Sequence, residues 1–182
     1  MKLFNLILLI SAINLGACAQ QDNTTDRALT TATAGNEPLP DAVVNELNEQ
    51  ALGDTVVKTE EEWRQQLTPE EYQVLREEGT ELAFRNEFND NKRRGVYSCA
   101  ACGNPMFTSE TKFESGTGWP SFYAPISEKR VKEVDDRALG MLRTEVECSR
   151  CGSHIGHVFP DGPKPTGLRY CLNSIALDFE EK

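Results

Sequence analysis

Positive charge is in short supply in this sequence. Its 182 residues include 19 lysines and arginines against 29 aspartates and glutamates, which gives a formal net charge of −10. A surface that binds nucleic acid usually carries a basic stripe, so this balance argues against a nucleic-acid partner. It argues equally against attachment to anionic lipid headgroups by charge alone.

A hydrophobic run long enough to span a bilayer is also missing near the N-terminus. The uncharged, mostly apolar stretch 3–15 follows Lys2 and is too short to cross a membrane as a helix. Such a stretch after a positive residue is typical of a signal peptide. It ends in Leu15-Gly16-Ala17-Cys18, which resembles the lipobox of bacterial lipoproteins. The alternative is an ordinary secretory signal with an incidental cysteine.

From the lipobox resemblance we expect residues 1–17 to be a cleaved lipoprotein signal peptide and Cys18 to carry the lipid. The mature chain would be exported and lipid-anchored to the bacterial cell envelope, facing the periplasm or the outside. Its contact with the membrane would come from burial of the acyl chains and not from charge.

Aromatic residues are absent from residues 19–59, where Gln, Asn, Thr, Asp and Ala dominate. Such a composition cannot bury enough apolar surface to offset the entropy lost on ordering. We therefore predict a flexible, lipid-anchored linker over residues 18–58. One short helix can interrupt it, with Asp41 as its cap and Gly53 as its end.

Helix signals of greater strength begin at residue 59, and one ordered domain is expected over residues 59–182. Thr59 with Glu62 fits a capping box and predicts a helix that carries Trp63. The run Thr68-Pro69-Glu70-Glu71 combines a cap, a proline and a glutamate at the positions that begin a helix. This second helix is expected to stop at Gly79.

Long helices are missing after Gly95, where short segments with strand character are separated by Gly, Pro and Ser. The last segment, 169–179, alternates over Cys171, Asn173, Ile175 and Leu177. Short strands without long helices between them indicate antiparallel sheets. The expected fold is mainly β, with strands at 95–99, 112–115, 130–134, 142–148 and 169–179.

Cysteine is scarce, but four of the six cysteines form two near-identical turns, Cys99-Ala-Ala-Cys102-Gly and Cys148-Ser-Arg-Cys151-Gly. Two such turns brought together give the tetrahedral thiolate set that a structural zinc prefers. One alternative is two disulfides, whose small loops would constrain the chain little. Another is a redox-active pair, which usually lies at a helix start in a βαβ setting. We predict one structural zinc without an open coordination position.

Histidine occurs only at His154 and His157, both within six residues of Cys151. Arg169 and Asn173 flank Cys171 at two positions on either side, so the three share one face of a strand. A cation beside a thiol lowers its pKa. Taken singly, each of these residues could be purely structural: the cysteine could be buried and inert, and the histidines could be core residues or further zinc ligands. Together they favour a reactive thiol with a proton carrier nearby.

The chain resembles the B-type methionine sulfoxide reductases over most of residues 60–179. The resemblance rests on the TPEEY helix, both cysteine pairs and the motifs SGxGWPSF, HIGHVFPDGP and GLRYCLNS. It implies a mainly β fold of two small antiparallel sheets with N-terminal helices and a structural zinc site. It also implies reduction of the R epimer of methionine sulfoxide, chiefly in oxidised proteins.

The resemblance further implies a role for each matching residue. Cys171 would be the nucleophile that attacks the sulfoxide sulfur. His157 would protonate the departing oxygen, supported by Asp161 and His154, while Arg169 and Asn173 would hold the thiolate and polar groups. The remaining matches would be the substrate-binding residues Trp119, Phe122 and Phe159 and the zinc ligands Cys99, Cys102, Cys148 and Cys151.

One position departs from the family pattern. Many members have a cysteine at the third position of SGxGWPSF, which resolves the oxidised nucleophile, and this chain has Thr117 there. We therefore expect an external thiol reductant, thioredoxin-like or a small molecule, to reset Cys171. Two other classes stay open at this point: a non-catalytic zinc-ribbon binding module of the same fold, and a disulfide oxidoreductase that uses a C-x-x-C pair.

Overall fold

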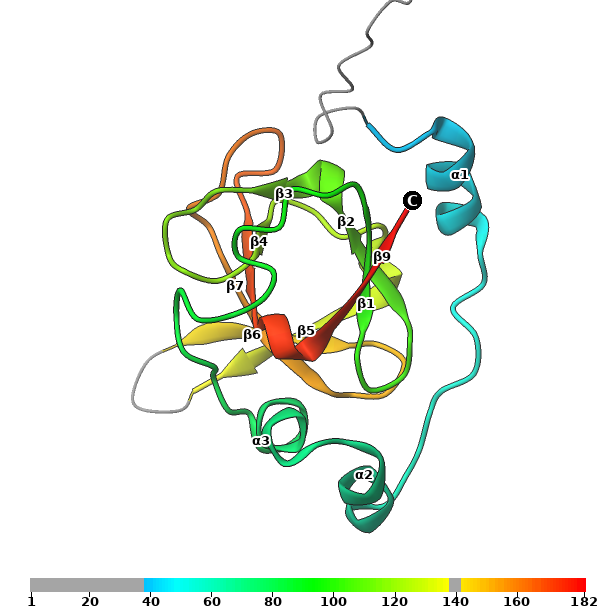
Figure 1. Cartoon of the computed structure of the whole chain (residues 1–182), viewed down its shortest axis with the longest axis vertical. Coiled ribbons are helices and arrows are strands. Elements are labelled where there is room, and N and C mark those ends of the chain that lie inside the picture. Colours follow the sequence, from blue (N-terminus) through cyan, green and yellow to red (C-terminus); the bar gives the residue numbers. More distant parts are fainter. Residues whose placement is uncertain (1–37, 138–141) are drawn as a thin grey trace, which may run out of the picture. The chain divides into compact units, whose positions relative to one another are not determined.

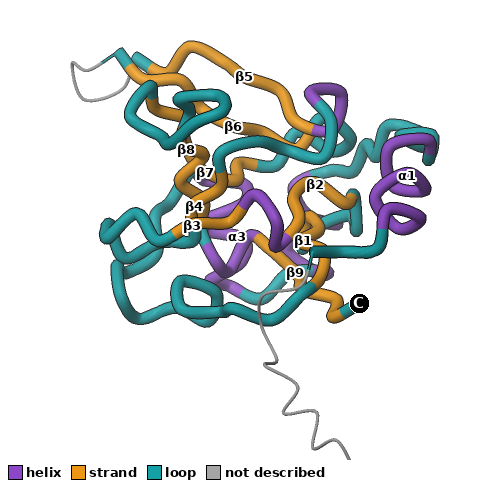
Figure 2. Tube along the Cα trace, turned by 90° about the horizontal axis from the view of Figure 1, so that it is seen from above, coloured by secondary structure: helices purple, strands orange, loops and turns teal. Residues whose placement is uncertain are grey.

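The structure is a computed structural model that describes residues 38–137 and 142–182. The expected signal peptide and Cys18 lie outside the described residues. Within them, no helix is long and apolar enough to cross a membrane. Figure 1 shows helices along the outside of two groups of strands, and Figure 2 shows the same elements from above.

Three helices precede the strands. The first, α1 (Asp41–Glu49), has Pro40 as its N-cap residue without a side-chain cap, so Asp41 is its first residue and not the expected cap. It ends before Gly53. The segment expected to be a linker contacts the rest of the chain: Leu39 is buried, and the Arg130 guanidinium donates to the carbonyl oxygens of Leu47 and Gln50 at 2.6 and 3.0 Å.

The next two helices begin where the capping boxes predict. In α2 (Glu60–Gln66) and α3 (Pro69–Glu77), Thr59 and Thr68 each accept from the backbone of a glutamate whose side chain returns to the cap. Trp63 of α2 and Leu75 of α3 are each only 1% exposed to solvent. Helix α3 ends at Glu77 with Glu78 as its C-cap, so Gly79 follows the cap as expected, although Glu78 and not the glycine adopts the left-handed conformation, at φ 55°. The Gly79 amide then closes the helix by donating to the Gln73 carbonyl.

Two antiparallel sheets form the rest of the domain, as the mainly β expectation requires. The smaller sheet has the order β2-β1-β9 and the larger the order β3-β4-β8-β7-β6-β5. Their bounds are β1 Gly95–Cys99, β2 Pro105–Thr108, β3 Lys112–Phe113, β4 Ser121–Phe122, β5 Val131–Asp136, β6 Arg143–Cys148, β7 His154–Phe159, β8 Arg169–Leu172 and β9 Leu177–Glu181.

The segment 169–179 is not the single strand that its alternation predicted. It divides into β8, in the larger sheet, and β9, in the smaller one, with a 3-10 helix at Ser174–Ala176 between them. The Asn173 amide donates to the Ile155 carbonyl at the end of β8, and the Ala176 amide returns to the Asn173 carbonyl. This turn moves the chain from one sheet to the other directly after Cys171.

An aromatic cluster fills the core between the sheets. Tyr97 from β1 has its ring centroid 5.0 Å from that of Phe122 in β4 and 4.8 Å from that of Phe179 in β9. Phe107 from β2 adds contacts to Phe122 and Tyr170. Because both sheets contribute to this core, packing on one face of the larger sheet holds its central strands in place.

Candidate active site and metal centre

Cys171 lies in the middle of the larger sheet. On β8 it is opposite His157 of β7 on one side and Ser121 of β4 on the other. The two central strands approach very closely, because a Cβ on Gly156 would lie 2.2 Å from the Cys171 carbonyl oxygen. Only glycine fits at position 156, because any side chain there would collide with the backbone of β8.

The Cys171 side chain lines a small, mostly apolar cavity of about 150 Å³. Trp119 and Phe159 provide aromatic surface, and His157 and Asn173 provide polar groups. The residues Thr80, Arg143, Gly156 and Leu172 complete the lining. The structure thus brings together five of the residues that the sequence pointed to.

Hydroxyl groups surround the thiol on its other side. Thr117 Oγ1 lies 3.8 Å from Cys171 Sγ and 2.8 Å from Ser115 Oγ, which in turn accepts from Ser121 Oγ at 2.7 Å. Burial raises the pKa of the Cys171 thiol, and Thr117 and Arg169 lower it by less. Arg169 therefore lowers this pKa, as expected of a neighbouring cation, but burial has the larger effect and raises the pKa overall.

His157 is paired with an acid that the sequence analysis missed. Its Nε2 lies 2.9 Å from Asp136 Oδ2, and Arg143 Nη2 donates to the same oxygen at 2.5 Å. Burial lowers the pKa of His157, while the hydrogen bond to Asp136 opposes that effect. Asp136 comes from β5, two strands away from β7, and no spacing in the sequence relates the two residues.

Asp161, expected to support His157, pairs with Arg169 instead. The Arg169 guanidinium donates to both Asp161 carboxylate oxygens at 2.9 Å and stacks 4.5 Å from the centroid of the Phe159 ring. The carboxylate is largely exposed, whereas the guanidinium is largely buried. Arg169 is thereby fixed on the face that carries Cys171, and Asp161 acts on it and not on the histidine.

His154 forms a second, deeper histidine–acid pair. Its Nδ1 lies 2.7 Å from Glu145 Oε1, and both side chains are nearly excluded from solvent. The His154 and His157 rings meet edge to face at 5.3 Å between centroids. Burial lowers the pKa of His154, so a neutral imidazole is favoured there. His154 thus packs against His157 without being part of the cavity lining.

Glu81 positions two residues of the cavity lining, and no sequence motif pointed to it. Its carboxylate accepts from the backbone amides of Ser174 and Ile175, at 2.5 and 3.0 Å. Its own amide donates to Asn173 Oδ1, and its carbonyl accepts from Trp119 Nε1 at 3.2 Å. One residue therefore positions both Trp119 and Asn173, through contacts more than thirty residues apart in sequence that only the fold creates.

Phe122 does not contact the cavity. Its side chain is fully buried in the aromatic core beside Tyr97 and Phe107. Alternation along β4 explains this: Ser121 lies opposite Cys171 and faces the site, so Phe122 points to the other side of the sheet. The expectation that Phe122 contacts substrate is therefore wrong for this geometry, and its contribution is to the core.

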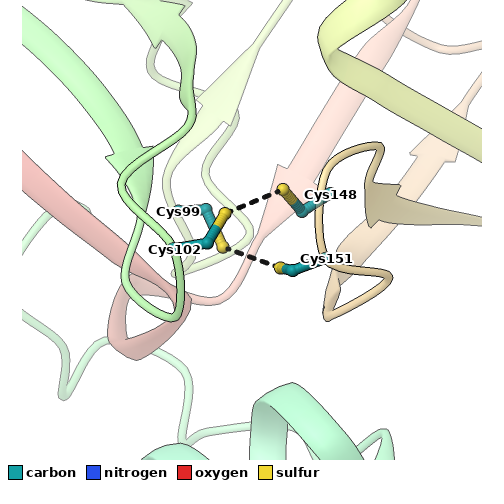
Figure 3. Close-up of side chains that lie close together, drawn as sticks. All are labelled: Cys99, Cys102, Cys148 and Cys151. Carbon is teal, nitrogen blue, oxygen red and sulfur yellow. Dashed lines mark hydrogen bonds between the residues drawn. The ribbon is translucent and has the colours of Figure 1, made fainter. Parts of the chain in front are cut away.

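Four cysteines form the metal centre (Figure 3). The ligand sulfurs of Cys99, Cys102, Cys148 and Cys151 lie within 4.8 Å of one another. Two cross pairs are separated by 3.7 and 3.6 Å. Tetrahedral zinc with Zn–S bonds of about 2.3 Å places its sulfurs about 3.8 Å apart, so the cluster fits one zinc.

Each cysteine pair lies on a tight turn whose final glycine has positive φ, 71° at Gly103 and 68° at Gly152. These glycines donate to the carbonyls of Cys99 and Cys148, which closes the turns. Nothing within 4 Å would meet a side chain there, so glycine is required for conformation and not for space.

The geometry of the four-cysteine cluster favours a zinc site over the two alternatives for these cysteines, a pair of disulfides and a redox-active C-x-x-C. The close sulfurs pair across the two turns, between residues 46 and 52 positions apart, and not within a C-x-x-C. Both pairs lie on β-turns and not at helix starts, and the described cysteines are free thiols.

Comparison with known proteins adds a consistent result. The sequence matches the SelR domain over residues 67–181. It is 58% identical over 125 residues to the peptide methionine sulfoxide reductase MsrB of Thiobacillus denitrificans, covering 69% of this chain and 95% of that protein. The MsrB of Methanosarcina barkeri is 61% identical over 125 residues, with coverages of 69% and 88%. That of Leptospira interrogans is 54% identical over 127 residues, with coverages of 70% and 97%.

Proposed function

The chain belongs to the SelR-domain family of peptide methionine sulfoxide reductases, and from that premise we propose that it reduces the R epimer of methionine sulfoxide in oxidised proteins. It is a methionine sulfoxide reductase with a four-cysteine structural zinc site. The observation that carries the proposal is the position of Cys171: a nucleophilic sulfur faces a small apolar cavity between an indole and an imidazole. A non-catalytic binding module would have no use for that arrangement.

The proposed reaction transfers an oxygen atom from the methionine sulfoxide sulfur to the sulfur of Cys171. The Cys171 sulfur attacks the sulfoxide sulfur as a thiolate, and its proton passes to the sulfoxide oxygen. The sulfur–sulfur bond formed by this attack then breaks together with the bond between the methionine sulfur and the oxygen, and a bond between that oxygen and the Cys171 sulfur forms. The products are methionine, reduced by two electrons, and Cys171 sulfenic acid, oxidised by two. No external proton is consumed.

His157 is the residue best placed to carry that proton. It is opposite Cys171 across the strand pair, and its ring lines the cavity. Burial lowers its pKa, which keeps a neutral imidazole able to accept the thiol proton, and Asp136 stabilises the imidazolium formed next. Trp119 and Phe159 would receive the S-methyl group, while Arg169 and Asn173 would hold the polar groups of the intermediate.

An external thiol completes the cycle in this proposal. One thiol attacks the Cys171 sulfenic acid, releasing water and forming a mixed disulfide, and a second thiol releases reduced Cys171. Within the described residues the other four cysteines belong to the metal cluster. Zinc, when bound there, supplies a structural cross-link between two turns. A thioredoxin-like protein or a small thiol would provide the electrons.

The proposal extends to the cellular location. The sequence before residue 19 supports export with a cleaved signal over residues 1–17, lipidation of Cys18 and a linker over residues 18–58. The protein would then be anchored to the cell envelope and act on periplasmic or external proteins. Cys18→Ser should abolish labelling by fatty acid and leave an unlipidated precursor or shed soluble protein. A wild-type chain that takes up no fatty acid and fractionates as soluble would contradict this part alone.

An epimer-resolved assay tests the activity. Wild-type protein with dithiothreitol should convert peptide methionine-R-sulfoxide and leave the S epimer. Cys171→Ser should retain its zinc and fold but lose turnover. Equal activity on both epimers would contradict the stereochemical proposal. Unchanged activity of Cys171→Ser would contradict the assignment of the nucleophile.

A further inference from the structure

An exposed apolar ledge lies next to the cavity, on the loop that follows helix α3. Leu82 and Phe84 are 69% and 68% exposed, although both are large apolar side chains. Single exposed apolar residues are common on protein surfaces. These two are distinguished by where they lie and by how the loop is held.

The loop is tied to the cavity wall by backbone contacts. The Phe84 amide donates to the Gly118 carbonyl at 2.9 Å, and Asn86 Nδ2 donates to the same oxygen at 2.7 Å. Two residues before Phe84, the Leu82 carbonyl is held by the Arg85 amide and Asn86 Nδ2. On the cavity side, the Glu81 carbonyl accepts from Trp119 Nε1. The ledge is therefore continuous with the wall that receives the substrate methyl group.

Phe84 is held there in a strained conformation. Its φ of 59° lies in the left-handed region, which an aromatic residue rarely adopts. Its ring covers the backbone of Gly118, where an added Cβ would lie 2.7 Å from Phe84 Cδ2. Strain of this kind persists only where the surroundings impose it, and it gathers at binding sites. The structure thus holds an exposed apolar ring against Gly118, the residue that precedes Trp119.

We propose that Leu82 and Phe84 bind an apolar side chain adjacent to the oxidised methionine in a substrate polypeptide. The inference rests on the proposed function and deepens it, because the cavity of about 150 Å³ admits the sulfoxide side chain and leaves its neighbours outside. Methionine is commonly buried with other apolar residues, and its oxidation disrupts such cores. An apolar neighbour is therefore frequent in the substrates that need repair. The ledge gives it a place to be shielded from water.

The test compares a small substrate with two peptides. The small substrate is N-acetyl-methionine-R-sulfoxide amide, which has no neighbouring side chain. The peptides carry the R-sulfoxide flanked by leucine or by serine. Wild-type enzyme should show a lower KM for the leucine peptide than for the serine peptide.

Two variants remove the apolar surface in different ways. Phe84→Asn introduces a residue that tolerates the left-handed conformation. Leu82→Gln replaces an apolar side chain by a polar one at a position without backbone strain. Each should raise KM for the leucine peptide by roughly threefold to tenfold, the scale of one lost apolar contact. KM for the small substrate should stay unchanged. Val57→Gln, which alters an 86% exposed side chain beside the zinc turn, is the matched control and should change neither value.

The possible failures are distinguishable. A wild-type protein that reduces none of the R-sulfoxides refutes the proposed function itself. Active variants whose KM values match wild type on all three substrates refute the ledge. An equal rise on the small substrate shows that the loop shapes the cavity only, and it also refutes the ledge.

Discussion

Thr117 Oγ1 lies 3.8 Å from Cys171 Sγ, on a loop whose neighbouring glycines, Gly116 and Gly118, both have positive φ. A hydroxyl thus occupies the place beside the nucleophile from which a second thiol could reach it. Because a hydroxyl cannot reduce a sulfenic acid, we expect a thiol from outside the chain to reset the oxidised cysteine.

The first prediction follows from that contact. With excess substrate and no reductant, wild-type enzyme should form one methionine per chain, and a sulfenic-acid probe should label Cys171. The substitution Thr117→Cys should instead yield a disulfide to Cys171, because the two sulfurs need approach by only about 2 Å to reach bonding distance. Peptide mapping by mass spectrometry distinguishes the two. An internal disulfide in the wild-type chain, formed with release of zinc, would show that a metal ligand resolves the sulfenic acid.

The second prediction concerns Asp136. Replacing it with asparagine removes the carboxylate that stabilises protonated His157, so the pKa of His157 falls further below its usual value. We expect kcat/KM to fall by about tenfold or more, yet by less than the roughly 10²–10⁴-fold expected for loss of a general acid in His157→Ala. The limb of the pH profile that reports the histidine should move to lower pH. Measurement of kcat/KM against pH checks both.

Asp135→Asn is the matched control for this change. Asp135 is the preceding residue, but its side chain is 73% exposed and pairs only at 3.7 Å with Arg137. It should leave the rate and its pH profile unaltered. An Asp136→Asn enzyme with a wild-type profile would show that the His157 pair has no part in the proton transfer.

The third prediction uses the buried state of Cys171. Burial raises the pKa of this thiol, so its thiolate should appear at higher pH than in an exposed cysteine, whose pKa is about 8.5. Alkylation of Cys171 by iodoacetamide, followed by mass spectrometry, should accelerate with a midpoint above that value. Arg169→Met removes a cation that lowers the pKa, so the midpoint should rise further. Arg137→Met, at an exposed site, should not move it. A wild-type midpoint near 7 would contradict the dominance of burial.

The fourth prediction concerns the metal. Cys148→Ser should release zinc and lower the free energy of unfolding by several kcal/mol, because the binding energy of a structural metal is part of the folding energy. Urea unfolding and elemental analysis measure the two effects. Cys171→Ser serves as the control, since it removes a cysteine outside the cluster and should keep both the zinc and the stability. Full stability of a zinc-free wild-type protein would refute the structural role.

The parts of this site that sequence could predict are local. Each zinc turn is set by two cysteines and a glycine within five residues, and each capping box by residues three positions apart. Alternation correctly placed Arg169 and Cys171 on one face of a strand. It could not show that the strand ends at Leu172, because the alternation of residue types continues through Ile175 and Leu177, although burial stops alternating at the change of sheet.

The partners of the histidines depended on strand order. Asp161 is four residues from His157 and was the obvious candidate, but the loop between β7 and β8 turns it toward Arg169. Asp136 is twenty-one residues from His157 and reaches it because β5, β6 and β7 are adjacent in the sheet. Register across strands is a tertiary property, and no spacing in one segment encodes it.

The zinc turns come from different sheets: Cys99 and Cys102 join β1 to β2, and Cys148 and Cys151 join β6 to β7. The site thus ties together points 46 to 52 residues apart, a loop of the size that a disulfide would be used to close. A disulfide there would be open to attack by the same reductant that turnover requires. A metal cross-link contains no bond that a thiol can reduce, so the reductant that restores Cys171 in each cycle would leave the framework intact.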